Sequence, residues 1–490
     1  MTAKRKKVAV LVTHGMGEQI PMETLTSFVK AAWVTNVDVH WPPPPDENSG
    51  DTWFAPDPLT GSLELRRITT RWTKSKVNPA DKGPRVDFFE FYWADLAEGT
   101  TVHEVWDWLR TLLVRWPHQV PKGLMGAWLL LWSGAAVVTI LSLLALSPWP
   151  GGWWHAGFAA AAAAVAYLMQ YLVSPYVGDV ARYVRAGPRN VAMRRAIRDR
   201  GLKLLNDLHD SGAYERIIVV GHSLGAIVAY DLVSLLWATR RDALVLREDE
   251  PAFAKLRALE TAAHALTNAT AAERQEKQRI YREAQRTFRL ALRSGGGDGN
   301  GRLRKPGEEW LISDFVTLGS PLTHAQFLLA RDATDLTEKV TRWLFPTNPP
   351  QFELVQSEQR TKIDARPEPP SEEVYGPRDG LFSYFLASPK TWSMHHAAPF
   401  ATMRWTNIYD SHHWIFHGDI ISGPAAPVFG SGIRDIDLKD LRGQSPVFSH
   451  TLYWALAADR KLSDPMPHVD ALRRAIDLLD QPDRDVWAGF

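Results

Sequence analysis

The chain has 490 residues, of which 56 are lysine or arginine and 55 are aspartate or glutamate, so its formal net charge is +1. A nucleic-acid partner is therefore not expected, because such proteins carry a strongly basic domain or stripe. The sequence contains no cysteine, which excludes disulfides, thiolate metal sites and cysteine nucleophiles. The length allows a large core and more than one structural unit.

The N-terminal region contains two predicted strands. Val8 to Thr13 is an apolar run that is too short for the hydrophobic segment of a signal peptide, and it leads directly into a glycine-containing turn. Arg85 to Trp93 is a second strand-like stretch. The proline-rich segment 41–51 between them is typical of a surface loop.

Two uncharged segments follow. Residues 124–146 carry no charge over 23 positions. As a helix this segment is about 34 Å long, which is enough to cross a bilayer core of about 30 Å. A second uncharged but alanine-rich segment, His155 to Val173, follows a short loop that contains tryptophan. The pair predicts a transmembrane helical hairpin, and the alternative interpretation is a buried helical hairpin of a soluble domain.

Basic residues flank this hairpin, whereas the joining loop has no charge. They are Arg110, Arg115 and Lys122 before it, and Arg182, Arg185, Arg189, Arg194, Arg195, Arg198, Arg200 and Lys203 after it. The positive-inside rule then predicts that both ends face the cytoplasm. The basic helix after the second segment is interpreted either as a solvated face or as a surface for anionic head groups.

The segment "RIIVVGHSLGAIVAYDLV", residues 216–233, combines a predicted strand, a turn and a predicted helix. Ile217 to Val220 is a buried strand pattern, and Leu224 to Val233 is an apolar helix pattern. The turn between them reads G-x-S-x-G. A serine on such a sharp turn presents its hydroxyl clear of both elements, and the flanking glycines remove side chains that would clash. We interpret Ser223 as a nucleophile.

Further strand patterns occur at Leu311 to Leu318 and at Met403 to Tyr409, and helical patterns separate them. This alternation predicts a mostly parallel sheet covered by helices. Residues 251–293 are charged and helix-favouring, end in a glycine-rich linker, and are interpreted as an insertion above the sheet that serves as a lid or a docking arm. The proline-rich and aromatic region 338–400 is interpreted as a lid or a substrate wall.

An activated serine also needs donors for an oxyanion. The backbone N–H of Leu224 is the first candidate, because it follows the nucleophile at the start of the helix. The second is the N–H of Met16 in "THGMGEQ", where Gly15 lets the backbone turn closely. His14 in the same stretch is interpreted as a side chain that packs in the turn.

Together these segments resemble the α/β-hydrolases of the lipase and esterase type. "VTHGMGEQ" resembles the oxyanion loop, "VVGHSLGA" the nucleophile elbow, and "VTLGSPL" the strand end that follows the elbow in many lipases. The resemblance implies an α/β-hydrolase fold into which a transmembrane hairpin and helical cap or lid segments are inserted. It also implies the chain order serine, acid, histidine for a catalytic triad.

The acid is assigned within "RWTNIYDSHHWIFHGDIISGP". This stretch resembles a lipase segment in which a strand leads to an aspartate that is followed by a hydrophobic residue and "SGP", which selects Asp419. Asp410 lies closer to the end of the strand and is the rival. The intervening histidine-rich stretch is longer than the resemblance would lead one to expect.

The base is assigned to His450 in "VFSHTLYW", which follows the acid at a plausible distance. His468 is the alternative. Three more histidines precede or adjoin the acid: His412, His413 and His417. Neither a metal site nor a cofactor is expected, because the chain has no cysteine and no H-E-x-x-H motif.

These assignments predict a membrane-anchored serine hydrolase that cleaves carboxylic esters, with the bilayer and a lipid or acylated substrate as partners. An acyl-protein or acyl-carrier thioesterase and a non-catalytic membrane scaffold are the alternatives. We expect a bacterial inner-membrane location with the hydrolase domain facing the cytoplasm. The expected division is hydrolase core at 1–120, transmembrane hairpin at 121–175, core with the elbow at 176–250, charged insertion and linker at 251–301, core at 302–337, lid-like insertion at 338–400 and C-terminal core at 401–490.

Overall fold

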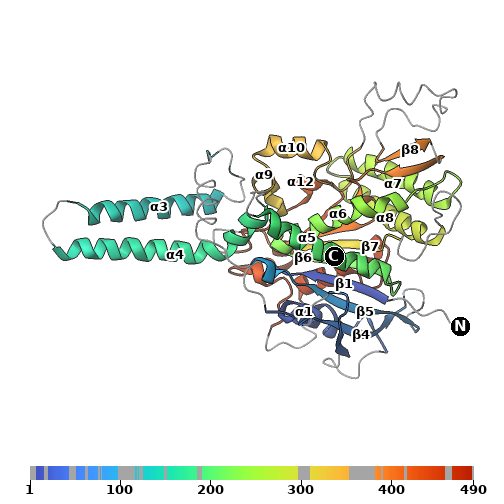
Figure 1. The fold of residues 1–490 in the computed structure, drawn as a ribbon, viewed down its shortest axis with the longest axis horizontal. Coiled ribbons are helices and arrows are strands. Elements are labelled where there is room, and N and C mark those ends of the chain that lie inside the picture. The colour runs from blue at the N-terminus through green and yellow to red at the C-terminus, as the bar shows by residue number, and fades with distance from the viewer. Residues whose placement is uncertain are drawn as a thin grey trace.

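A computed structural model describes most of the chain. The described residues are 7–15, 20–42, 51–60, 64–75, 78, 80–97, 116–117, 120, 125–147, 152–184, 190–295, 309–352, 381–387, 390–412, 417–457 and 466–487. They form a main body built around a central sheet, and two long helices project from it (Figure 1).

The central sheet has nine strands in the described part of the chain: β1 Lys7–Thr13, β2 His40–Trp41, β3 Thr52–Pro56, β4 Arg66–Lys74, β5 Lys82–Phe91, β6 Tyr214–His222, β7 Ile312–Leu318, β10 Arg404–Tyr409 and β11 Arg434–Asp437. The strand order is β11-β10-β7-β6-β1-β5-β4-β2, and β3 pairs with β4. The six strands from β11 to β5 are parallel, whereas β4 pairs antiparallel with β5, β2 and β3. The carboxyl ends of the six parallel strands therefore share one edge of the sheet.

Helices cover both faces of this sheet (Figure 1). The helices are α1 Glu23–Val29, α3 Met125–Ala145, α4 Gly152–Val184, α5 Val191–Asp210, α6 Leu224–Arg240, α7 Pro251–Thr267, α8 Arg274–Gly295, α9 Ala325–Leu328, α10 Ala333–Thr341, α12 Ala426–Phe429, α13 Leu438–Arg442, α14 Pro467–Ile476 and α15 Asp483–Val486. A separate antiparallel pair consists of β8 Ser383–Ala387 and β9 Lys390–Met394. The prediction of a largely parallel sheet flanked by helices is confirmed.

The core has two layers because successive strand residues point to opposite faces of the sheet. In β1, Ala9 and Leu11 pack with the helices α5, α6 and α8, whereas Val8, Val10 and Val12 pack with α1 and α14. Both sets are fully buried. This alternation fixes the register of the central strands, since a slip by one residue would exchange the two faces.

The charged segment 251–293 forms two helices, α7 and α8, and α8 is part of the packed body. Tyr281 and Phe288 are fully buried in the core cluster that covers the sheet. Arg282 is also buried and donates to Asp483 Oδ1 at 2.8 Å and to the carbonyl oxygen of Trp405 at 2.8 Å. Helix α8 therefore covers the sheet and packs against β10. The interpretation of the segment as an insertion that serves as a lid or a docking arm stays a prediction.

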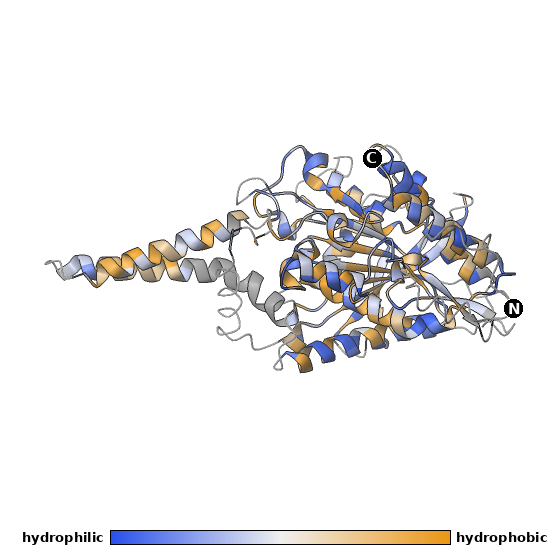
Figure 2. Cartoon of the chain, turned by 90° about the horizontal axis from the view of Figure 1, so that it is seen from above, coloured by the Kyte–Doolittle hydropathy of each residue, from blue (hydrophilic) through white to orange (hydrophobic). Residues whose placement is uncertain are grey.

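The two projecting helices are α3 and α4, which lie side by side outside the main body (Figure 1). Residues of α3 are mostly apolar (Figure 2), yet only 6% of Trp128–Ala145 is buried. Among the described residues, α3 is the one helix that is both long and apolar enough to cross a membrane. A helix of this composition in the core of a soluble protein is mostly buried, whereas Ile140 and Leu143 of α3 are 56% and 64% exposed.

The end of α4 is fixed to the main body next to α6. Tyr183 is buried, and its hydroxyl donates to Asp231 Oδ2 at 2.9 Å. Arg198 of α5 binds the same carboxylate. Because α6 begins one residue after Ser223, this contact joins the base of the helical pair to the helix that follows the predicted nucleophile.

Candidate active site

Ser223 lies on a sharp turn between β6 and α6. Its backbone has φ 54° and ψ −129°, a conformation that non-glycine residues rarely adopt. Such strain persists where the surrounding structure holds it, and here the N–H of Ser223 donates to the carbonyl oxygen of Leu318 at 2.9 Å. The turn places the serine at the carboxyl edge of the sheet, and its side chain is buried.

The glycines around this turn are required by close backbone contact. A Cβ atom on Gly225 would lie 2.2 Å from the carbonyl oxygen of His14, and one on Gly15 would lie 2.9 Å from Cβ of Ser223. Side chains at these positions would overlap with atoms of the neighbouring loop. The loop after β1 and the turn after β6 therefore meet directly at the serine.

Three side chains from separate segments form a chain of hydrogen bonds. His450 Nε2 lies 2.9 Å from Ser223 Oγ, and His450 Nδ1 lies 2.9 Å from Asp419 Oδ2. Asp419 follows β10, and His450 lies in a short helical turn, Ser449–Thr451, after β11. The structure thus brings together the serine, the histidine and the first-choice acid predicted from the sequence, which lie up to 227 positions apart.

The carboxyl group of Asp419 is fully buried and tightly bonded. Burial alone would raise the pKa of Asp419, but the neighbouring His450 ring and hydrogen bonds from His450, Tyr453 and Ile421 hold this pKa below its ordinary value. Asp419 Oδ1 accepts from the N–H of Ile421 at 2.9 Å. The carboxylate is therefore ionised near neutral pH and faces the imidazole.

Of the two predicted oxyanion donors, Leu224 and Met16, only Leu224 lies in the described part of the chain. Leu224 is the first residue of α6, so its N–H has no partner within the helix and lies beside Ser223. Gly15 approaches Ser223 as predicted, whereas Met16 lies outside the described residues.

His14 fixes the loop that contains Gly15. Its ring is buried and stacks on Trp93 at 5.0 Å between ring centroids. Nε2 accepts from the N–H of Trp93 at 3.1 Å, so Nδ1 carries the proton and donates to the carbonyl oxygen of Gly15 at 2.9 Å. Burial lowers the pKa of His14 to about 4, so the ring is neutral near pH 7. His14 thus ties the loop after β1 to the end of β5.

Sequence reasoning did not identify two further side chains that support the site. Tyr453 is fully buried, and its hydroxyl donates to Asp419 Oδ2 at 2.7 Å. His222 forms a hydrogen bond through Nε2 to the carbonyl oxygen of His450 at 2.9 Å. Burial lowers the pKa of His222 to about 3, so this ring is a neutral donor. The only sequence signals were that Tyr453 lies three residues after His450 and that His222 precedes the serine.

The rival residues lie elsewhere. Asp410 is buried and accepts from Arg442 Nη1 at 3.2 Å and from the hydroxyl of Ser445. His468 lies in α14, where its Nε2 contacts the carbonyl oxygen of Ala455 at 2.9 Å. His417 pairs with Val447 in an isolated bridge, His412 lies in the loop before it, and His413 lies outside the described residues.

The arrangement has the parts needed for nucleophilic chemistry. A nitrogen of His450 faces a hydroxyl, its other nitrogen faces a buried carboxylate, and a helix N-terminus lies beside the oxygen. Across the described residues, no group of three or more histidine, aspartate or glutamate side chains is placed to hold a metal ion. Comparisons with protein-family models, with curated proteins and with solved structures give no match to this chain.

Proposed function

We propose that this protein is a serine hydrolase that cleaves carboxylic esters through an acyl-enzyme. The observation that carries the proposal is the continuous hydrogen-bonded chain from Ser223 Oγ through His450 to Asp419, with 2.9 Å at each step. A bare serine hydroxyl is a weak nucleophile, and an adjacent imidazole that is oriented by a carboxylate activates it.

In the proposed reaction, Ser223 Oγ attacks the ester carbonyl carbon while His450 Nε2 takes the hydroxyl proton. Asp419 keeps the proton of His450 on Nδ1 and stabilises the imidazolium that forms. The N–H of Leu224 donates to the oxyanion, and the sequence assigns the second donor to Met16. His450 then gives its proton to the leaving alkoxide. Water attacks the acyl-enzyme with His450 again as base, and the carboxylic acid leaves as the proton returns to Ser223.

An α/β-hydrolase fold is part of this proposal. The described sheet has a parallel run with β6 near its centre, and the serine follows β6 on a strained strand-to-helix turn. The three site residues occur in the chain order serine, aspartate, histidine, which is the order found in α/β-hydrolases. The loop after β1 meets the serine, as an oxyanion loop must.

Lipid esters are the substrate class that we propose. The support is the position of α3 and α4: α3 exposes apolar side chains, and the end of α4 is bonded to Asp231 of α6, the helix that follows the serine. A bilayer would cover the apolar side chains of the projecting helices. Both ends of this pair lie at the main body, so we propose that the hydrolase lies on one side of the membrane. The charged flanks assign that side to the cytoplasm, in a bacterial inner membrane.

Hydrolysis assays on the detergent-solubilised protein test this proposal. We expect fatty-acid release from phospholipid or acylglycerol micelles by the wild type and none by Ser223→Ala. Ser320→Ala is the matched control, because it removes another buried hydroxyl at the end of a central strand. Faster release from acyl-thioesters than from any lipid ester would favour the thioesterase. No release from either class by a folded wild type would favour the scaffold.

A further inference from the structure

His222, the residue before the proposed nucleophile, contacts two other parts of the candidate active site through one ring. It is the last residue of β6, where it pairs with Leu318 of β7. Its Nε2 lies 2.9 Å from the carbonyl oxygen of His450. Because a carbonyl oxygen only accepts, Nε2 carries the proton of the neutral ring and is the donor. The strand that leads to the serine is therefore bonded to the main chain of the proposed base.

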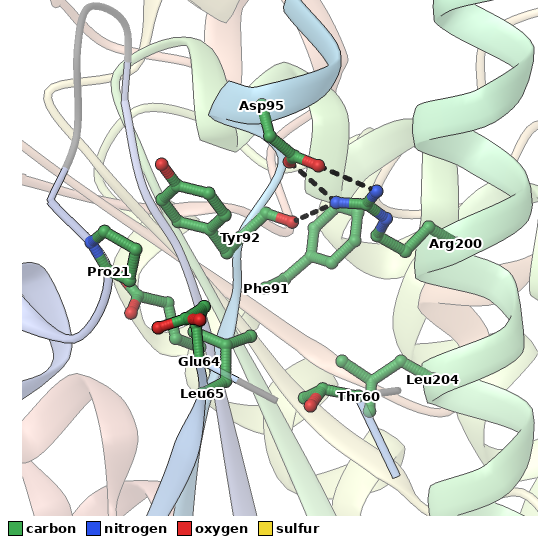
Figure 3. A pocket seen from close by; sticks show the side chains of 10 residues that line it. Pro21, Thr60, Glu64, Leu65, Phe91, Tyr92, Asp95, Arg200 and Leu204 are labelled. Atoms are coloured by element: carbon green, nitrogen blue, oxygen red, sulfur yellow. Dashed lines mark hydrogen bonds and ion pairs between the residues drawn. The ribbon is translucent and has the colours of Figure 1, made fainter. Parts of the chain in front are cut away.

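The other nitrogen of the same ring lies next to the loop after β1. A Cβ atom on Gly15 would be 3.3 Å from His222 Nδ1, so the ring contacts this loop where it approaches the serine. Further along the chain, Pro21 lines a cavity of about 340 Å³ beside the end of β5 (Figure 3). The described part of the loop is therefore fixed mainly at Gly15, by the hydrogen bond from His14 and by the ring of His222.

Trp454 fixes the orientation of the His222 ring. The two rings pack edge to face, with 4.9 Å between their centroids and an interplanar angle of 79°. Trp454 is itself bonded to α1, because its Nε1 donates to Ser27 Oγ at 3.0 Å and its ring lies 5.9 Å from that of Phe28. The ring of His450 lies 5.2 Å from that of His222. The segment that contains the proposed base thus packs against His222 as well as bonding to it.

We infer that His222 is a positioning residue that fixes the place of His450 relative to Ser223. This inference rests on the proposed function, and His222 acts through the main chain of the base without taking part in proton transfer. A shift of about 1 Å in a catalytic group can slow a reaction about 100-fold, so a donor that fixes the base affects the rate. Burial lowers the pKa of His222 to about 3, so the ring stays a neutral donor near neutral pH.

Two substitutions separate the donor of His222 from its ring. His222→Phe keeps a ring against Trp454 and removes the donor, whereas His222→Gln places an amide N–H close to the position of Nε2. With a soluble 4-nitrophenyl ester, His222→Phe should lower kcat by about 10- to 100-fold and leave KM within about twofold, because alignment of the reacting groups acts on the transition state. His222→Gln should keep kcat within about threefold of the wild type, since the donor is restored.

His40→Phe is the matched control. His40 Nε2 lies 2.9 Å from the carbonyl oxygen of Trp33, and its ring stacks on that of Trp33 with 4.4 Å between centroids. His40 belongs to β2, at the far edge of the sheet from β11 and four strands from β6. The same substitution there removes an equivalent hydrogen bond away from the candidate active site, so kcat of His40→Phe should equal that of the wild type.

Amide hydrogen exchange of the detergent-solubilised full chain, followed by mass spectrometry, tests the same contact without turnover. Peptides that contain the turn Ser449–Thr451 should exchange at least about threefold faster in His222→Phe than in the wild type, His222→Gln or His40→Phe, because the turn loses one hydrogen bond to the strand. If His222→Phe does not fold, His222→Asn replaces it in both measurements, because its shorter amide does not reach the carbonyl oxygen.

Three results would overturn the inference: a kcat of His222→Phe equal to that of His40→Phe, an equal loss of kcat in His222→Gln and His222→Phe, or unchanged exchange of the turn in a folded His222→Phe. A folded wild type that hydrolyses no ester would refute the proposed function. Faster exchange in His222→Phe alone would in that case still support the placement of His450 by His222.

Discussion

Tyr453 and His450 donate to the same oxygen of Asp419. The hydroxyl of Tyr453 lies 2.7 Å from Asp419 Oδ2, and His450 Nδ1 lies 2.9 Å from it. The hydroxyl of Ser422 lies 2.9 Å from that of Tyr453, and since Tyr453 donates to the carboxylate, Ser422 donates to Tyr453. Tyr453 therefore takes up part of the negative charge that faces the imidazole and fixes the plane of the carboxyl group.

Replacing Tyr453 by phenylalanine should slow ester hydrolysis. Without the hydroxyl of Tyr453, the carboxyl group of Asp419 loses a donor that fixes its plane, so kcat/KM should fall by roughly three- to tenfold while the protein stays folded. The measurement is kcat/KM with a soluble 4-nitrophenyl ester. Tyr230→Phe is the control, because it removes a buried hydroxyl that donates to the carbonyl oxygen of Pro346. A kcat/KM equal to that of Tyr230→Phe would contradict this role.

The two rival acids should respond differently to amide substitution. Asp419→Asn should lower kcat by roughly 10⁴-fold with little loss of stability, because the amide no longer orients the histidine. Asp410→Asn breaks the pair with Arg442, so it should lower the melting temperature while kcat of the folded protein stays within about threefold. Parallel melting curves and kcat measurements check this. The reverse pattern would assign the acid to Asp410.

Because the loop after β1 contacts the turn at Ser223, a side chain at Gly225 should destabilise the site. The methyl group of Gly225→Ala would overlap with the carbonyl oxygen of His14, so this variant should destabilise the fold by about 1–3 kcal/mol and abolish ester hydrolysis. At Gly157 in α4 an added methyl meets nothing within 4 Å, and Gly157→Ala is the control. Chemical unfolding and hydrolysis rates are the measurements, and equal behaviour of the two variants would contradict the packing described.

The buried ion pairs of α8 predict a pH-dependent loss of stability. Asp480 binds Arg289 at 2.7 Å, and both side chains are buried. Asp480→Asn leaves Arg289 without this carboxylate and should cost about 3–5 kcal/mol at pH 7. The surrounding arginines hold the pKa of Asp480 far below its ordinary value despite its burial.

A lowered folded-state pKa stabilises the fold above the unfolded-state pKa of about 3.9, and this contribution disappears as pH falls toward the folded-state value. The difference in unfolding free energy between wild type and Asp480→Asn should therefore have its largest value at pH 7 and decrease below about pH 4. Urea unfolding at several pH values checks this. A difference that does not change with pH would refute the charge-based explanation.

The exposed apolar face of α3 predicts membrane anchoring. The double variant Val137→Arg, Ile140→Arg places two charges on that face and should oppose insertion by about 5–7 kcal/mol, which shifts protein from the membrane fraction to the soluble or aggregated fraction. Leu235→Arg, Ile280→Arg is the control, because these side chains are similarly exposed on the main body. Resistance to carbonate extraction is the measurement. Equal extraction of wild type and both variants would contradict anchoring by α3.

Much of the central sheet and of the site could be predicted because local signals were strong. β1 and β6 are continuous apolar runs, and the glycines at Gly221 and Gly225 mark the turn between strand and helix. β4 and β11 were missed, since "RRITTRWTK" and "RDID" carry the charges of strands at or near the edges of the sheet. Their pairing depends on partners that are distant in the sequence.

The burial of polar residues in α8 could not be predicted from the sequence. Arg282, Gln285 and Arg289 look like a solvated helix face in the sequence, but all three are buried. The partners of the two arginines, Asp483 and Asp480, lie about two hundred residues further along the chain, so no local pattern distinguishes these ion pairs from exposed charges. Tyr453 was missed for the same reason, because its contact with Asp419 exists only in the folded protein.

Labelling by a fluorophosphonate tests the central claim most directly, because this probe forms a covalent bond with an activated serine and needs no knowledge of the substrate. The detergent-solubilised wild type should be labelled on the peptide that contains Ser223. Ser223→Ala should not be labelled, His450→Ala should be labelled at least about 10³-fold more slowly, and Ser320→Ala should match the wild type. A folded wild type without label, or equal labelling of Ser223→Ala, would contradict the assignment of Ser223 as the nucleophile.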